Sequence, residues 1–199
     1  MRVFDEQGLI ELLKSLSKKE VSCFAIAAAT RQIVGLERYF ALPNVEYRQI
    51  VDVLDRLWGD IKSEQANGEF WGGALPDVMS WLPDEGEEWS VFTALAEDAV
   101  SSLAYSIRSH QNGDPQEGAW AARCAYEAAD QAAIRFLGIQ PGTKESERTI
   151  LMHAIVQREL DRQTADIDRI KSGLFEDVRL AAISSPILQD DEVLRIRAL

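Results

Sequence analysis

Hydrophobic side chains recur with the period of an α-helix along nearly the whole chain, and this feature limits the fold more than any other. The clearest case lies between residues 45 and 65, where apolar positions are spaced three and four apart. Such spacing places one apolar stripe along one face of a helix, with charged residues such as Asp52 opposite. The pattern therefore predicts a helix over 45–65. The stripe comprises Tyr47, Ile50, Val51, Leu54, Leu57, Trp58 and Ile61.

Residues that commonly begin and end helices divide the rest of the chain. Ser17 and Glu20 have the spacing of a capping box, and Asn112-Gly113 is a stop signal followed directly by Asp114-Pro115, a start signal. Alternating apolar runs typical of strands are absent. We therefore expect an all-α fold, a single-domain bundle of six to eight helices over residues 1–199. The expected helices cover about 5–16, 18–42, 45–65, 90–112, 115–138, 144–170 and 174–183, with one or two further turns after Pro186.

The charge and the apolar content narrow the function classes. The 199 residues carry a formal net charge of -12, which disfavours binding to nucleic acid or to an anionic membrane. The N-terminus lacks the pattern of a signal peptide, and the most apolar stretch, residues 23–29, is far shorter than a membrane span. Cys23 and Cys124 both lie in alanine-rich helical patterns, which favours buried free thiols over a disulfide. A cytoplasmic protein is expected.

No motif indicates a cofactor, a metal or a catalytic site. His110 and His153 lack metal-binding helical spacings, so a structural role is the simpler interpretation for each. The sequence has neither a glycine-rich phosphate loop nor a nucleophile elbow. Acidic residues could still converge between helices as a catalytic or metal site, although a solvated face or an ion pair such as Glu159 with Arg162 is simpler. The acidic candidates are Glu97, Asp98, Asp130, Glu159 and Asp166.

The strongest functional signal is an uneven distribution of charge. The 45 residues from Ser63 to Ile107 contain nine acids and no Lys or Arg. Glycines and prolines within this stretch predict a loop-rich acidic insertion at about 63–90. Acids attract a basic partner over distance, and tryptophans are frequent anchors of protein interfaces, although these tryptophans could instead pin the loop to the core. The predicted partner-binding residues are Trp71, Trp81, Asp84, Glu85, Glu87, Glu88 and Trp89.

Several segments resemble a known family of bacterial proteins. The segments CFAIAAATRQIVGLERYFAL and YRQIVDVLDRLWGDI are similar to the start of the YjaG-like domain of unknown function. The segments EDAVSSLAYSIRS and RQTADIDRIKSGL continue the likeness, which spans roughly residues 20–175. The resemblance implies a small, all-helical bacterial protein. It implies no catalytic residues and leaves the function open.

These observations favour a non-enzymatic, acidic protein-binding module. An immunity-type protein that neutralises a basic toxin is the best-known bacterial protein of that description, and concentrated negative charge could mimic nucleic-acid phosphates. One alternative is a helical enzyme, or a small-molecule or metal binder, with a carboxylate site between helices. Another is a structural or regulatory homodimer formed through an apolar helix face.

Overall fold

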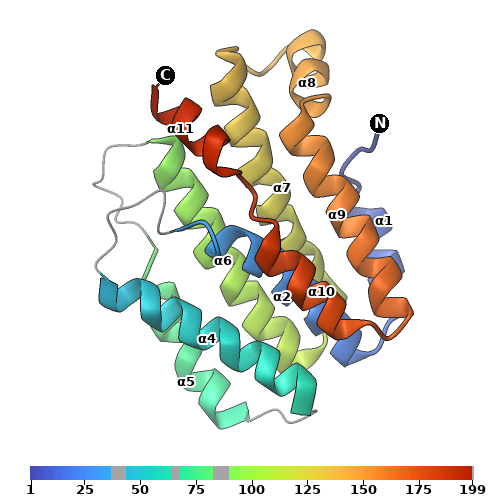
Figure 1. The fold of residues 1–199 in the computed structure, drawn as a ribbon. Helices are drawn as coiled ribbons and strands as arrows, with labels where there is room; N and C mark the ends of the chain where they lie inside the picture. Colours follow the sequence, from blue (N-terminus) through green and yellow to red (C-terminus); the bar gives the residue numbers. More distant parts are fainter. Residues whose placement is uncertain (37–43, 64–67, 83–89, 199) are drawn as a thin grey trace.

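The computed structural model describes residues 1–36, 44–63, 68–82 and 90–198, and within these ranges the protein is helical and has no strand (Figure 1). The all-α prediction is therefore confirmed for this part of the chain. None of its helices is long and apolar enough to cross a lipid bilayer. The helices are α1 (Glu6–Leu13), α2 (Lys18–Ile33), α4 (Asn44–Ser63), α5 (Gly68–Met79), α6 (Val91–Asn112), α7 (Pro115–Leu137), α8 (Lys144–Leu151), α9 (Ala154–Lys171), α10 (Phe175–Ser184) and α11 (Asp190–Ala198).

Helix α2 forms the centre of the bundle. Every residue from Val21 to Ile33 is buried, so this helix is covered on all sides rather than along one stripe. Its long run of small side chains brings α6 and α7 close, and α4, α9 and α10 also lie against it. Figure 1 shows α6 and α7 running side by side along the bundle. The core therefore depends on the helix that contains the apolar stretch 23–29.

Local capping residues fix where the helices begin and end. The capping box of Ser17 and Glu20 starts α2 as predicted. Gly113 ends α6 in the left-handed conformation at φ 72°, which glycine adopts without strain. A Cβ atom on Gly113 would also lie 2.9 Å from the Lys18 side chain, so a larger residue at position 113 would require Lys18 to move. Asp114 then caps α7 with Pro115 in its first turn, as the sequence predicted.

Helix α4 confirms the apolar stripe predicted over 45–65. Leu54, Leu57 and Ile61 are buried against the core, whereas Asp52 on the opposite face is exposed. Helix α4 packs on α2, and α5 packs on α6, so the two helices occupy one side of the bundle (Figure 1).

Three details of the prediction are wrong. The described residues form ten helices rather than six to eight. The helix expected over 144–170 is two helices, because Met152 ends α8 with 56% of its surface exposed and His153 begins α9 as the N-cap. The predicted loop-rich insertion at 63–90 contains α5, which forms despite two adjacent glycines and Pro76. Burial of Trp71 and Ala74 on the inner face of α5 outweighs the low helix propensity of the two glycines and Pro76.

Candidate functional site

The structure describes two of the seven predicted partner-binding residues. Trp71 is completely buried, and Trp81 is half-buried at the end of α5. The other five, Asp84, Glu85, Glu87, Glu88 and Trp89, lie outside the described residues. Trp81 alone of the described pair can therefore contact another protein without unfolding of the bundle.

Trp71 joins three helices inside the bundle. Its indole Nε1 donates a hydrogen bond to Asp60 Oδ2 at 2.8 Å, and its ring meets the edge of the His110 ring at a centroid distance of 5.6 Å. His110 Nε2 lies 3.2 Å from the same carboxylate oxygen. Burial lowers the pKa of His110, although Asp60 opposes the shift, so the imidazole is neutral at physiological pH. Trp71 and His110 are thus structural, and the alternative that a tryptophan pins this segment to the core is correct for Trp71.

A groove between α4 and α5, which we call the acidic groove, holds three carboxylates near an aromatic floor, and two of them, Glu69 and Asp77, belong to the Lys- and Arg-free stretch. Its volume is about 760 Å³. Asp52 comes from α4, whereas Glu69 and Asp77 come from α5, and no Lys or Arg lines the groove among the described residues. Phe70 and Trp81 supply the aromatic surface, and the remaining lining residues are Gln49, Val53, Gly73, Ala74 and Ser80.

The sequence of α5 explains how the groove stays open. Trp71, Ala74 and Val78 are buried at helical spacing, so the intervening positions face solvent or α4. Gly73 has no side chain, and a Cβ atom added there would meet nothing within 4 Å, so the groove is wide at this point. The guanidinium of Arg56 lies 3.5 Å from the centre of the Phe70 ring, which shows that this aromatic side chain already accommodates a cationic group.

The alternative carboxylate site of Glu97, Asp98, Asp130, Glu159 and Asp166 does not assemble as one cluster. Glu159 and Asp166 converge from α9 on Arg31 of α2, and all three side chains are at most 2% exposed. Asp98 lies on α6 and Asp130 on α7, and burial, together with the negative charge of Glu127, contributes to raising the pKa of both. No group of three or more His, Cys, Asp or Glu side chains suited to a metal ion is found in the described part of the chain.

The Arg31 cluster is a buried charge network. Arg31 Nε and Nη2 donate to the two carboxylate oxygens of Glu159 at 3.0 Å and 2.9 Å, and Nη1 donates to Asp166 at 2.5 Å. Gln163 Nε2 adds a hydrogen bond to Glu159 at 3.1 Å. Burial by itself would lower the pKa of Arg31, but the two carboxylates raise it above its usual value. The guanidinium of Arg31 therefore stays charged, and the cluster is a structural joint between α2 and α9.

Asp98 gives a testable pH dependence. Burial, with Glu127 and Glu97 nearby, raises the pKa of Asp98 to about 8. The pKa of an aspartate in an unfolded chain is about 3.9, so the unfolded chain loses this proton at a lower pH than the folded protein does. The free energy of unfolding should therefore fall as pH rises from about 4 to about 8. We expect Asp98→Asn to remove this fall and to stabilise the protein at pH 8 by on the order of 1–3 kcal/mol.

Urea denaturation of both proteins across this pH range checks the expectation for Asp98. Asp168→Asn, an exposed substitution on α9, is the matched control and should leave the pH profile unchanged. A profile for Asp98→Asn that runs parallel to the wild type would show that Asp98 is ionised at neutral pH.

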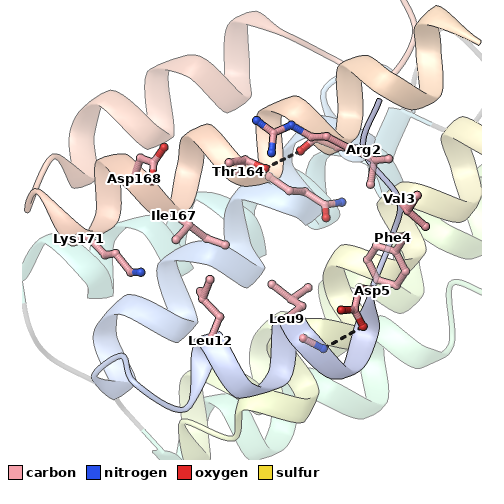
Figure 2. Close-up of a pocket in the computed structure, with 13 residues that line it drawn as sticks. Arg2, Val3, Phe4, Asp5, Leu9, Leu12, Thr164, Ile167, Asp168 and Lys171 are labelled. Carbon is pink, nitrogen blue, oxygen red and sulfur yellow. Dashed lines mark hydrogen bonds between the residues drawn. The ribbon is translucent and has the colours of Figure 1, made fainter. Parts of the chain in front are cut away.

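Figure 2 shows another pocket, between the N-terminal residues, α1 and α9. Leu9, Leu12 and Ile167 form its apolar floor, and its volume is about 460 Å³. Two basic side chains, Arg2 and Lys171, and two acidic ones, Asp5 and Asp168, also line it. Because these charges balance, the pocket offers no preference for a charged ligand, unlike the acidic groove.

The remaining residues singled out in the sequence have structural roles. Cys23 and Cys124 are both buried and free, as predicted. Burial raises the pKa of each thiol, so neither is a reactive thiolate at neutral pH. His153 caps α9, where its Nδ1 accepts a hydrogen bond from the Ile155 amide at 3.4 Å.

Comparison with known proteins agrees with the fold class, an all-helical bundle. A solved structure that is similar along most of its length is that of a DUF416 family protein from Shewanella baltica OS155. The two share 14% sequence identity and a TM-score of 0.74, and the match covers 89% of this chain and 94% of that one. No protein-family model matches the sequence, and no curated protein matches it. The likeness at this identity shows a shared fold.

Proposed function

We propose that the protein is a non-enzymatic binding module whose acidic groove takes a basic segment of another protein. The observation that carries the proposal is the grouping of Asp52, Glu69 and Asp77 around Phe70 and Trp81, with no Lys or Arg among the described residues that line the groove. Three carboxylates attract Lys and Arg side chains, and the aromatic surface can stack against their alkyl stems and guanidinium groups.

The finer proposal is an immunity-type protein that neutralises a basic toxin in the bacterial cytoplasm. Its support is the small size, the net charge of -12 and the concentration of nine acids between Ser63 and Ile107. Membership of the YjaG-like family belongs to the same proposal and rests on the resembling segments between residues 20 and 175, because the likeness to the DUF416 protein supports a small helical domain without specifying this family.

Charge reversal of the groove tests the proposal. We expect the triple substitution of Asp52, Glu69 and Asp77 by lysine to slow association with a fluorescent oligo-arginine peptide and with any captured partner. Long-range attraction sums over charges, so the loss should be largest at low salt and should shrink as salt screens it. Stopped-flow association rates at two ionic strengths measure both effects.

A matched triple variant controls for net charge. Glu145, Asp168 and Asp177 are exposed and lie away from the groove, on α8, α9 and α10. Reversing these three acids changes the total charge by the same amount but should slow association much less. Equal slowing in the two triple variants would mean that net charge, and not the groove, attracts the partner.

Trp81 tests the contact itself rather than the attraction. Replacement of Trp81 by alanine should speed dissociation of the partner at a cost of about 2 kcal/mol or more, because a half-buried tryptophan at a groove is a favourable anchor. Association should change little. Dissociation rates and a thermal melt of the free variant are measured together, since a tryptophan that serves only the fold would lower the melting temperature without changing dissociation.

A homodimer is a second candidate, supported by one observation. Leu174 precedes α10, and Leu180 and Ile183 lie on it, and all three are exposed. An apolar surface of this kind suits contact with a second copy. Light scattering after size-exclusion chromatography, for wild type and for Leu180→Glu, distinguishes this candidate from the groove, because the groove variants would leave the mass unchanged.

A further inference from the structure

The structure contains a second charged pocket, of opposite character to the acidic groove, which we call the arginine pocket. It lies between α9 and the end of α10, with a volume of about 620 Å³. Arg31 lies buried in its wall, and Arg158, Arg162 and Arg169 line it from α9. Ser184 and Ser185 line the opposite side at the end of α10. Four of the protein's basic residues thus meet in a chain whose net charge is strongly negative.

Two guanidinium nitrogens in this pocket have no hydrogen-bond partner. Arg158 Nε and Arg162 Nη1 are both buried, and no described group accepts from either. A buried donor that lacks an acceptor costs free energy, and native proteins usually supply one as a side chain, a water or a ligand. The two orphaned donors are therefore available to an acceptor that enters the pocket.

The carboxylates around the pocket do not satisfy these arginines fully. Glu159 and Asp166 are taken by Arg31, and Glu192 forms a two-point contact with Arg158 at 2.6 Å and 2.9 Å. The nearest carboxylate contacts of Arg162 and Arg169 are longer, 3.8 Å to Glu159 and 3.5 Å to Asp166. The other acid in the lining, Asp161, forms an ion pair with Arg2 at 2.5 Å.

The electrostatics of Arg162 agree with this geometry. Burial lowers the pKa of Arg162 to about 10, and the positive charges of Arg31 and Arg158 add to the shift against the attraction of Glu159. Its Nη2 donates a hydrogen bond to the Ser185 hydroxyl, whose own proton is then free to donate to a ligand. An anion bound here would offset the repulsion among three arginines and accept from the serine.

We propose that the arginine pocket binds the phosphate group of a small molecule. Guanidinium groups match phosphate oxygens with paired hydrogen bonds, and the two orphaned donors and the long carboxylate contacts of Arg162 and Arg169 leave hydrogen bonds that an anion could accept. The pocket has the volume of a typical small-molecule site, which leaves room for more than the phosphate. The proposal concerns a face distinct from the acidic groove, so it is independent of the proposed protein partner.

Amide NMR spectra of the intact protein test the proposal, with inorganic phosphate, glucose 6-phosphate and glucose as separate probes at constant ionic strength. We expect saturable shifts from inorganic phosphate or glucose 6-phosphate, concentrated at residues 154–169 and 181–185, and none from glucose. Binding of inorganic phosphate alone would identify a free-ion site, and preference for glucose 6-phosphate a phosphorylated metabolite. Absence of saturable shifts with both phosphate probes would overturn the proposal.

Two substitutions and a control locate the site. Arg162→Gln and Arg169→Gln should each weaken phosphate binding by about tenfold or more, as expected for loss of one charge-assisted hydrogen bond. Arg148→Gln removes the same charge from an exposed position on α8, outside the pocket, and should bind like the wild type. Far-UV circular dichroism checks that each variant is folded, and Arg169 is partly exposed, so its replacement keeps the test open if Arg162→Gln unfolds. Equal weakening in all three would show nonspecific attraction and overturn the proposal.

Discussion

Replacement of Arg31 by methionine is expected to lower the free energy of unfolding by about 3–5 kcal/mol, because it leaves two buried carboxylates without their cation. Arg31 is 1% exposed and makes three hydrogen bonds to Glu159 and Asp166. Burial already raises the pKa of Asp166 although Arg31 opposes the shift. Without the guanidinium, both acids must take up protons or draw in water. Urea denaturation at pH 7 measures the loss.

A triple variant separates the charge from the packing. Adding Glu159→Gln and Asp166→Asn to Arg31→Met removes the uncompensated negative charges at nearly constant volume, so it should recover much of the lost stability. The single variant should also recover as pH falls, since protonation neutralises the same two acids. A triple variant as unstable as Arg31→Met would mean that methionine fails to fill the space and that charge is not the cause.

The Arg31 cluster also shows which part of a site can be predicted from sequence. Glu159 and Asp166 are seven residues apart in one helical pattern, so their shared face could be predicted. Arg31 lies 128 positions from Glu159, and nothing local indicates that α2 and α9 would pack with these side chains opposed. Helical periodicity gives the face of a helix, whereas the partner of that face depends on tertiary packing.

Helix ends were predictable because capping interactions are local in the sequence, whereas buried partners come from distant parts of the chain. The capping residues Ser17, Gly113 and Asp114 act within three or four residues of themselves, and each stands at the helix start or end that the sequence predicted. The break at His153 was missed, because the apolar positions continue on both sides of it and His is not a typical capping residue.

Helix α5 was missed because composition and spacing disagree there. Glycines at 68, 72 and 73 and Pro76 are typical of a loop, yet Trp71, Ala74 and Val78 keep helical spacing and are buried. That spacing was the signal that could have identified the helix. The same spacing determines which tryptophan is buried, since a residue on the inner stripe of a helix lies in the core. Trp71 is on that stripe, whereas Trp81 follows the helix and reaches the groove.

Replacement of Leu54 by aspartate is expected to destabilise the protein by more than about 4 kcal/mol. Leu54 is 5% exposed in the middle of the inner face of α4, within the hydrophobic core. The substitution removes buried apolar surface and places an unpaired carboxylate among apolar side chains. Because α4 also forms one wall of the acidic groove, a variant that melts in this region should lose binding of a basic partner as well.

Two controls make the result for Leu54 specific to its face. Asp52→Ala alters the exposed face of the same helix and should change stability by no more than about 0.5 kcal/mol, while weakening partner association slightly. Leu54→Met keeps the volume and the apolar character, so it should cost less than about 1.5 kcal/mol. Thermal and urea melts of the three variants rank these costs. If Asp52→Ala and Leu54→Asp lowered the melting temperature equally, the inner face of α4 would be assigned wrongly. The position of Asp52 at the acidic groove would then be wrong as well.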